Sequence, residues 1–476
     1  MNSIEFNSIT EAKEALDQKR LSVTELINLF FDLIKETDQN YHCFLELNYD
    51  SAIRQAQAID QDFENKISKP LKGIPIALKD NIVTKGLRTT CGSKILQSWI
   101  PPYDATVVKK LKEAGAIVVG KTNMDEFAMG SSTEYSAFGP TKNPLDTSCV
   151  PGGSSGGSAA AIAASLSLGA LGSDTGGSIR QPAAFCGVVG VKPTYGRVSR
   201  FGLVAFASSL DQIGPFARNV NDAALLLDVV SGNDPMDSTS LNVAATNFFK
   251  SLNSEVAGLK VGLIKELTDQ CDQVVKETIQ KLCDLLADYN VVISEISMPS
   301  LEYSLPAYYL IAPAEASSNL ARFDGVRYGL RIDGSSAKDM MIKTRTEGFG
   351  NEVKRRIMLG TYVLSHGYYD AYYLKALKVR TLIKKEFEKA YQNYDLLICP
   401  TTPTLPFKLG ERMADPVSMY LSDLCTIPSN LAGHPSISVP FGPKVKNFQV
   451  GIQVLANELD EQKMFNLAKF IEEADE

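Results

Sequence analysis

The chain has 476 residues, of which 44% are apolar and 22% are charged, and its formal net charge is −7. These values are ordinary for a globular protein, so they exclude a wholly disordered chain, and 34 Gly with 22 Pro exclude a collagen-like one. The acidic balance also argues against a broad basic surface for nucleic acid.

The numbers of histidines and cysteines limit the classes of enzyme that this chain can belong to. There are only three histidines, His42, His366 and His434, so a zinc enzyme or a Ser-His-Asp hydrolase would have to use them. The eight cysteines show no CxxC spacing, which favours reduced thiols of a cytosolic protein. The start, MNSIEFNSIT, does not resemble a signal peptide, and the segment 158–172 is too short and too rich in Ala, Ser and Gly to span a membrane. We therefore expect a cytoplasmic protein without membrane contact.

The predicted elements begin with a helix after Ser22. Residues Ser22 to Glu25 form a capping-box pattern, and apolar residues follow on one helical face: Leu26, Leu29, Phe30 and Leu33. Short apolar runs then predict strands at 74–78, 116–119, 260–264, 291–296, 396–399, 436–439 and 448–455. Helical patterns lie between several of them, at 107–114, 274–289 and 463–471.

This alternation predicts an α/β fold with a largely buried, mixed sheet. No internal repeat or long linker divides the chain, so we expect one domain over residues 1–476. The region 300–390 is mostly helical in pattern and rich in Tyr and Arg, and it can form a subregion that is inserted into the core or caps it.

The most unusual stretch is 150–190, where two Gly/Ser loops flank an Ala-rich helix predicted at 159–168. A loop of this composition on the surface would be flexible. Here it runs directly into small residues that suit tight packing. Buried Gly-rich loops let backbone N–H groups approach another group closely.

Three hypotheses compete for the first loop. Phosphate binding lacks the G-x-x-x-x-G-K-[ST] pattern. A nucleophile elbow fits the G-x-S-x-G spacing of residues 152–156, but no strand directly precedes it and its histidine would have to be His366 or His434. The third hypothesis uses Lys79, at the end of a buried strand, as the base that activates a serine.

A lysine can act as a base only if burial lowers its pKa from about 10.4. Serines at 154 and 178 supply candidate hydroxyls, and the turn at 174–178 adds consecutive backbone N–H groups, as an oxyanion hole requires. From the residues alone this remains one option among several.

Four blocks resemble the amidase signature family: GIPIALKDN at 73–81, PGGSSGGSAAAIAA at 151–164, GSDTGGSIRQPAAFCGVVGVKPTYGRVS at 172–199 and SSLDQIGP at 208–215. The resemblance extends from about residue 8 to the end, and no motif is broken. It implies the amidase signature fold, a central mixed β-sheet covered by helices on both faces. Further blocks at 121–134, 312–325, 354–360 and 367–373 resemble the branch of glutaminase subunits in tRNA-dependent amidotransferases.

The resemblance implies a Ser–cis-Ser–Lys triad, in which Ser178 is the nucleophile, Ser154 the bridging serine and Lys79 the base. It places a cis peptide next to the bridging serine, at Gly153–Ser154 or alternatively at Ser154–Ser155. Backbone N–H groups are implied to hold the oxyanion, those of Thr175, Gly176, Gly177 and Ser178.

By the same resemblance, glutamine is bound by four side chains: Ser131, Tyr309, Arg356 and Asp423. Arg356 would hold the α-carboxylate, because a guanidinium binds a carboxylate in bidentate fashion, and Asp423 the ammonium. Arg355 is an equal alternative to Arg356 on orientation, and a helix cap is the alternative for Asp423.

The implied activity is hydrolysis of glutamine to supply ammonia for amidation of Glu-tRNA(Gln), Asp-tRNA(Asn) or both. The implied partners are a larger B subunit, which uses ATP and Mg²⁺ and carries most of the mischarged tRNA, and a small C subunit, in a heterotrimer. We expect no cofactor and no metal on this chain. The alternative functions are a free-standing amidase for small or aryl amides, and a non-catalytic scaffold, which would lack a member of the triad.

Overall fold

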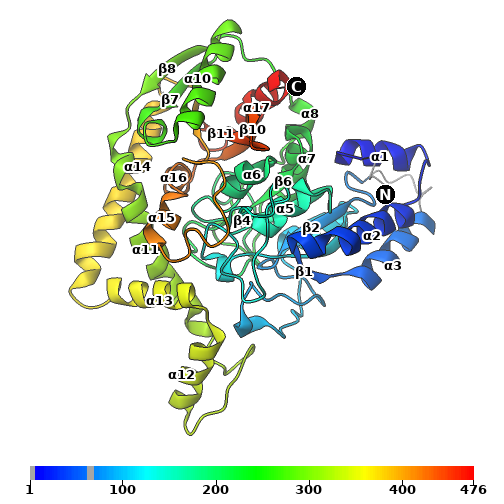
Figure 1. Cartoon of the computed structure of the whole chain (residues 1–476), viewed down its shortest axis with the longest axis vertical. Coiled ribbons are helices and arrows are strands. Elements are labelled where there is room, and N and C mark those ends of the chain that lie inside the picture. The colour runs from blue at the N-terminus through cyan, green and yellow to red at the C-terminus, as the bar shows by residue number, and fades with distance from the viewer. Residues whose placement is uncertain (1–5, 62–68, 476) are drawn as a thin grey trace.

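The computed structural model describes residues 6–61 and 69–475. Its centre is a mixed sheet in which the eleven described strands follow the order β1-β3-β2-β4-β6-β5-β10-β11-β9-β7-β8 (Figure 1). The strands are β1 Phe44–Leu47, β2 Pro75–Lys79, β3 Ile117–Thr122, β4 Gly169–Asp174, β5 Val189–Lys192, β6 Gln212–Ala217, β7 Lys260–Ile264, β8 Val292–Ile296, β9 Leu396–Pro400, β10 Ser436–Val445 and β11 Phe448–Ala456.

Parallel pairing is confined to two parts of the sheet. Strand β2 runs parallel to both β3 and β4, and β7 runs parallel to both β8 and β9, whereas the other pairs are antiparallel. All five residues of β2 are buried, and Lys79 is the last of them. The strand therefore delivers a lysine into the interior, beside the ends of β3 and β4.

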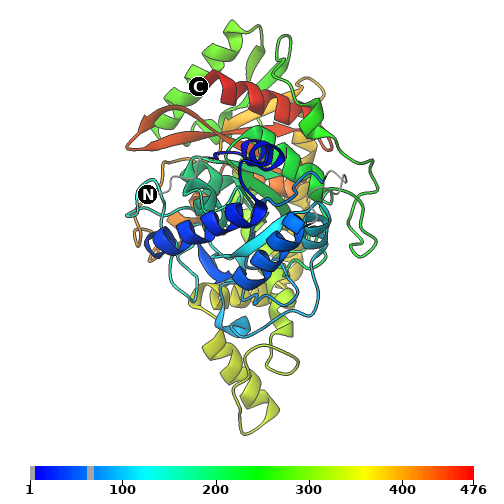
Figure 2. The same ribbon diagram turned by 90° about the vertical axis from the view of Figure 1, so that its right-hand side faces the viewer.

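The helices are α1 Ile9–Asp17, α2 Val23–Tyr41, α3 Tyr49–Gln61, α4 Thr106–Glu113, α5 Gly156–Ala163, α6 Arg180–Cys186, α7 Val220–Val230, α8 Phe248–Ser251, α9 Lys265–Thr268, α10 Gln273–Asp288, α11 Ser304–Asn319, α12 Ala337–Gly348, α13 Asn351–Val363, α14 Leu374–Ala390, α15 Pro416–Leu421, α16 Ile427–Ala432 and α17 Glu461–Asp475. Short 3-10 or π turns are η1 Lys94–Leu96, η2 Glu126–Ala128, η3 Pro299–Tyr303, η4 Leu320–Arg322 and η5 Tyr369–Tyr373. Helices lie over both faces of the sheet, as Figures 1 and 2 show.

The helical region between β8 and β9 forms one flank of the molecule (Figure 1). Helix α11 packs against α13 and α14, and both α11 and α14 contact α16. Helix α12 extends away from the sheet at the lower end of the view. This flank brings residues of α11 and α13 beside the segment around α16, which is the second wall of the site described below.

The seven strands predicted from the sequence are present, and the capping box is formed, with Ser22 accepting from the Glu25 N–H group. Strands β1, β4, β5 and β6 were not predicted. The predicted helix at 159–168 is wrong at both ends, because α5 starts at Gly156 and stops at Ala163. Ser165 then takes a left-handed φ of 60°, which turns the chain into β4.

All eight cysteines are buried and free. The Sγ atoms of Cys271 and Cys425 lie 4.0 Å apart, which is a contact between thiols and not a disulfide bond. Within the described residues, no helix is both long enough and apolar enough to cross a membrane.

Candidate active site

Lys79 is fully buried and faces hydroxyl groups. Its Nζ atom donates to Ser154 Oγ at 2.7 Å, to Ser155 Oγ at 2.8 Å and to Ser173 Oγ at 3.0 Å, with the Ser173 carbonyl at 3.2 Å. In the described part of the chain it forms no ion pair with a carboxylate. Each acceptor is therefore neutral, and nothing beside the amine compensates a positive charge fully.

Burial lowers the pKa of Lys79 from 10.5 to about 7, and the more distant carboxylates of Asp125, Asp174 and Asp211 oppose this only in part. A lysine with such a pKa is substantially uncharged near neutrality, so its lone pair can accept a proton. Of the three hydroxyls in reach, that of Ser154 is the nearest, at 2.7 Å.

The loop that carries Ser154 is held from several sides. The cis peptide lies between Gly153 and Ser154, the first of the two predicted positions. The Gly153 N–H group donates to Gln181 Oε1 at 2.8 Å, and the Asp125 N–H group donates to the Ser154 carbonyl at 3.3 Å. A Cβ atom on Gly153 would lie 2.2 Å from Asp125 Oδ2, so only glycine fits here.

Ser178 lies in the turn between β4 and α6 and is 8% exposed. Its carbonyl accepts from the Ser155 N–H group at 3.2 Å, which joins the two serine loops. Its Oγ atom makes no hydrogen bond to any residue that the structure describes. The hydroxyl is thus both positioned by its backbone and available to react.

The backbone N–H groups beside Ser178, which are the predicted oxyanion donors, differ in whether they already have a partner. The Gly177 N–H group, one of the predicted donors, donates to Asp174 Oδ1 at 2.8 Å in this structure. In the described chain the N–H groups of Gly176 and Ser178 have no such partner. A Cβ on Gly177, whose φ is 142°, would lie 2.2 Å from Thr426 Oγ1, so this turn excludes larger residues.

Asp174 also anchors the turn through Arg180, which is fully buried. Burial alone would raise the pKa of Asp174, but the Arg180 guanidinium lowers it to about 2. Arg180 also donates to Thr426 O just before α16, to Ser429 Oγ and Asn430 Oδ1 within α16, and to Gln453 Oε1 on β11. The nucleophile turn is therefore fixed to the segment that carries Asp423.

A second wall of the site is charged. Arg356, on the inner side of α13, donates from Nε to Glu352 Oε1 at 2.8 Å. Its guanidinium carbon lies 5.2 Å from the ring centroids of both Tyr309 and Tyr420, and these two rings stack at 3.9 Å. Arg355 turns outward instead, and 47% of its side chain is exposed. The sequence could not say which of the two arginines faces the site, and the structure shows that it is Arg356.

Asp423 is buried beside the cluster around Arg356. Its Oδ2 atom accepts from Ser131 Oγ at 2.5 Å, and burial raises its pKa to about 7. Helix α16 begins shortly after it without a side-chain cap, so the helix-cap alternative for Asp423 is not what the structure shows.

The two walls meet through Gln181. This side chain accepts from Gly153, next to Ser154, and donates from Nε2 to the Ser131 carbonyl at 3.0 Å. On the other side, a Cβ on Gly177 would lie 3.4 Å from Asp423 Oδ1. The triad residues and the predicted substrate residues consequently surround one region.

Sequence reasoning missed the residues that support this site: Asn81, Asp125, Ser155, Ser173, Gln181 and Glu352. Most of these lie inside the family blocks, so their proximity in the sequence was the available signal. Asp125 fixes the turn at 132–135 by accepting from the Thr133 and Tyr135 N–H groups at 2.9 and 3.1 Å.

The histidines lie elsewhere. His434 packs against Phe387 and Tyr391, and burial lowers its pKa to about 3. His366 is exposed in the turn before η5. In the described chain neither histidine is hydrogen-bonded to Ser154 or Ser178, so the geometry offers no Ser-His pair.

Comparison with known proteins agrees with this geometry. The family model described as "Amidase" matches residues 25–465. The chain belongs to the amidase family. A solved structure of the A subunit of glutamyl-tRNA(Gln) amidotransferase from Thermotoga maritima is 45% identical, with a TM-score of 0.83, and the match covers 99% of this chain and 96% of that one.

Two further relatives, each named as the A subunit of glutamyl-tRNA(Gln) amidotransferase, are similar over their full length. The one from Microcystis aeruginosa is 56% identical over 471 residues and is covered to 98%, as is this chain. The one from Carboxydothermus hydrogenoformans is also 56% identical over 471 residues, covering 98% of this chain and 97% of that protein. The family and the amidase signature fold predicted from the sequence are confirmed.

Proposed function

We propose that this chain is the glutaminase subunit of a tRNA-dependent amidotransferase. It hydrolyses glutamine and supplies ammonia for the amidation of Glu-tRNA(Gln), Asp-tRNA(Asn) or both. The names of its full-length relatives support the role of the A subunit. The observation that carries the chemistry is the 2.7 Å contact between Lys79 Nζ and Ser154 Oγ, in surroundings that lower the lysine pKa to about 7.

The reaction starts with a proton relay. Uncharged Lys79 accepts the proton of Ser154, and Ser154 accepts the proton of Ser178 as the Ser178 oxygen bonds to the side-chain amide carbon of glutamine. The N–H groups beside Ser178 stabilise the oxyanion, and the loss of one such donor typically costs about 2.7–4 kcal/mol.

The intermediate then collapses. The carbon–nitrogen bond breaks, and Ser154 returns the proton to the leaving nitrogen, so ammonia departs and a γ-glutamyl ester remains on Ser178. Water, deprotonated through the same relay, attacks that ester and releases glutamate. Lys79 ends each half-reaction uncharged, so the cycle needs no external base.

The charged wall fits the other end of glutamine. Arg356 is a buried cation that can pair with the α-carboxylate, and Asp423 is a buried acid beside Ser131 that can pair with the α-ammonium. The stacked Tyr309 and Tyr420 rings hold the Arg356 guanidinium from one side. An amide without these charged groups would form neither of these two interactions, which favours glutamine over simple amides.

The rest of the assembly follows from this role. We propose a heterotrimer in the cytoplasm, in which a B subunit uses ATP and Mg²⁺ and carries most of the mischarged tRNA, with a small C subunit. The net charge of −7 is compatible with a chain that leaves the tRNA mainly to its partner. No metal or cofactor takes part in the steps assigned to this chain.

The test is ammonia release from glutamine by the purified chain, alone and co-expressed with B and C subunits, compared with Ser178→Ala. We expect release that increases with the partners and is lost in the variant. Release from small or aryl amides by the lone chain, with glutamine a poor substrate, would instead support a free-standing amidase. Activity that survives Ser178→Ala would show that the nucleophile is wrong.

A further inference from the structure

Two of the eight free cysteines touch each other. The Sγ atoms of Cys271 and Cys425 lie 4.0 Å apart, and both thiols donate to one acceptor, the Leu267 carbonyl, at 3.1 and 3.5 Å. Among the described residues, no other two thiols are in such contact. The S–S bond of a disulfide is about 2.05 Å long, so an approach of roughly 2 Å would join these two sulfurs.

The two cysteines differ in their access to solvent. Cys271 lies in the turn between α9 and α10, and the residues on both sides of it, 269–270 and 272–273, are exposed. Cys271 itself is 6% exposed, whereas Cys425 is completely buried. A cavity of about 440 Å³ lies beside the pair, and its lining includes the chain neighbours Gln270 and Leu424. A small oxidant can therefore reach Cys271 from the side of the turn.

Cys425 lies in the segment between α15 and α16 that supports the glutamine pocket. Asp423, which is assigned to the α-ammonium, precedes it by two residues. Directly after it, the Thr426 hydroxyl donates to the Gly176 carbonyl in the nucleophile turn at 2.7 Å. A displacement of Cys425 would therefore disturb both the charged wall and the backbone beside Ser178.

The turn that carries Cys271 is anchored as well. The Cys271 N–H group donates to the Thr268 carbonyl at 3.1 Å, and the Asp272 N–H group donates to the Pro403 carbonyl at 2.9 Å. These bonds hold the turn to α9 and to the segment after β9. Joining the two sulfurs consequently displaces Cys425 as well as the turn.

The surroundings of the pair give the two cysteines different roles. The hydrogen bond with Cys271, together with burial, raises the pKa of the Cys425 thiol well above its ordinary value, so this thiol keeps its proton. Thiolates react with peroxides and thiols do not, and Cys271 is the more accessible of the two. Cys271 therefore reacts first, and Cys425 is in place to attack the oxidised sulfur.

We propose that Cys271 and Cys425 form a disulfide bond in the presence of a peroxide, and that this bond lowers glutamine hydrolysis, an effect that rests on the proposed function. Cys271 Sγ attacks hydrogen peroxide, the O–O bond breaks, and a sulfenic acid and one water form. Cys425 Sγ then attacks the Cys271 sulfur, the S–O bond breaks, and the S–S bond and a second water form. The peroxide is reduced, both sulfurs are oxidised, and a thiol reductant reverses the change.

Other thiols near the pair are less suited. Cys399 lies on β9, which pairs with β7 and β11, and its Sγ atom accepts from Gln453 Nε2 at 3.0 Å. These bonds hold Cys399 in the sheet. Cys283, on α10, is 8% exposed and touches no other thiol among the described residues. It is therefore a matched control for Cys271.

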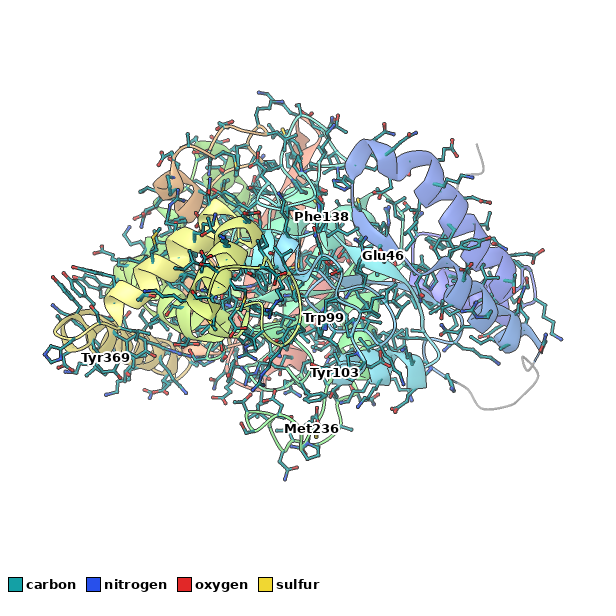
Figure 3. The ribbon with its side chains drawn as sticks, turned by 90° about the horizontal axis from the view of Figure 1, so that it is seen from below. Glu46, Trp99, Tyr103, Phe138, Met236 and Tyr369 are labelled. Atoms are coloured by element: carbon teal, nitrogen blue, oxygen red, sulfur yellow. The ribbon has the colours of Figure 1, made fainter. Side chains whose placement is uncertain are left out.

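The test exposes the purified full chain to hydrogen peroxide, blocks the remaining free thiols by alkylation and digests the protein with trypsin. We expect a linked pair of peptides, 266–276 and 413–444, each of which contains one of the two cysteines. Dithiothreitol should remove the link, and Cys271→Ser and Cys425→Ser should both lack it. Met236, an exposed methionine at the edge of the molecule, shows by its oxidation that the peroxide was active in each sample (Figure 3).

Activity is measured on the same samples with B and C subunits present. Peroxide should lower kcat/KM for glutamine at least about tenfold, because a misplacement of about 1 Å can cost about 10²-fold in rate. Dithiothreitol should restore it. Before oxidation, Cys271→Ser and Cys283→Ser should lie within about twofold of wild type. After oxidation, Cys271→Ser should keep its activity, whereas Cys283→Ser should lose activity as wild type does.

Three results would overturn the proposal. The first is wild type in which Met236 is oxidised but no linked peptides form, and the second is linked peptides with unchanged hydrolysis. The third is an equal loss of activity in Cys271→Ser, because the loss would then arise elsewhere. Reduced wild type that hydrolyses no glutamine with its partners present would overturn the proposed function instead, and the linked peptides would still show whether the bond forms.

Discussion

The two walls of the site treat a buried cationic side chain in opposite ways. The hydroxyl wall, Lys79 with Ser154, Ser155 and Ser173, surrounds a buried amine with neutral oxygens. The charged wall, Arg356 with Glu352 and Asp423, places the Glu352 carboxylate and two tyrosine rings against a buried guanidinium. Burial lowers the pKa of Lys79 to about 7, whereas the pKa of Arg356 stays high because its neighbours compensate the charge. One wall yields a base, and the other a binding site for charged groups.

A neighbouring lysine sharpens the comparison. Lys121 lies on β3, pairs with Leu78 of β2 in the parallel register, and is equally buried. It differs in having Asp80 at 3.6 Å, and it donates to the Ile82 carbonyl at 2.6 Å and to Thr89 at 2.8 Å. Lys121 is thus part of a structural ion pair, whereas Lys79 contacts only neutral oxygens and can exchange a proton.

The largest expected effect separates these two lysines. Lys79→Met should lower kcat for glutamine hydrolysis at least about 10³-fold, because loss of a triad base removes most of the catalysis. Lys121→Met should instead leave Asp80 buried without its cation, and breaking such a pair costs about 3–5 kcal/mol of unfolding free energy. Steady-state kinetics and thermal unfolding of both variants distinguish the roles. Equal loss of kcat in the folded fraction of both would contradict the comparison.

The charged wall should affect recognition of glutamine. Arg356→Ala should raise KM for glutamine roughly 10- to 150-fold, the range for lost hydrogen bonds to charged groups of about 1.5–3 kcal/mol. Arg355→Ala, a matched control one residue away, should change KM less than about twofold, because exposed ion pairs contribute little. Hydrolysis of an uncharged small amide should be insensitive to both. A similar KM in the two variants would refute the assignment of the buried arginine.

The pH dependence of glutamine hydrolysis should reveal the ionisation of one residue from each wall. Lys79, whose pKa is lowered to about 7, loses its function as a base when it is protonated below that pH, so kcat rises with pH and levels off above it. Asp423, whose pKa is raised to about 7, must be ionised to bind an ammonium, so kcat/KM falls more steeply on the acidic side than kcat does. Each ionisation changes the rate about tenfold per pH unit below its pKa.

Asp423→Asn isolates one of the two ionisations. It should lower kcat/KM overall and reduce the acidic slope of log kcat/KM from about two to about one. An acidic limb of unchanged slope in this variant would exclude Asp423 from binding the ammonium.

The smallest expected effect concerns Glu126, which holds the start of α13. Its carboxylate accepts from the Gly350 N–H group at 2.8 Å and from Ser93 Oγ at 2.5 Å, and the Gly350 position has no side-chain cap of its own. Glu126→Gln should raise KM about two- to fivefold with kcat nearly unchanged, since a charge at a helix N-terminus is worth about 0.3–1 kcal/mol.

The matched control for Glu126 is Asp339→Asn, which alters the carboxylate at the start of α12. Helix α12 carries none of the residues assigned to glutamine, so KM should not move. A drop in kcat for Glu126→Gln, or an equal change in KM for both variants, would argue for a general loss of stability.

The sequence predicted the elements with ordinary patterns and missed those built for close packing. Strand β4 is GALGSD and β6 is QIGPFA, so neither has the β-branched run that marks a strand. Both are fully buried, and their small residues let the serine loops and α6 approach the sheet. Burial on both faces removes the alternation on which strand prediction depends.

The same limit applies to the site. The resemblance supplied Lys79, Ser154 and Ser178 because they lie in continuous blocks, but spacing along the chain carries no information about orientation. It left Arg355 and Arg356 equal, and it gave no sign that the Gly177 N–H group donates to Asp174. Gln181 and Glu126 act by joining segments 28 and 224 residues apart, respectively, which only the fold reveals.

The mechanism requires Lys79 to be uncharged near neutrality, and its pKa can be measured directly. Lysine labelled with ¹³C at Cε gives one signal per side chain, and the Lys79 signal is the one that Lys79→Met removes without affecting the others. We predict that this signal titrates at a pKa of about 7, well below the ordinary lysine value. A midpoint near the ordinary lysine value of about 10.4 would contradict the mechanism, because the amine would then be protonated whenever the relay has to accept a proton.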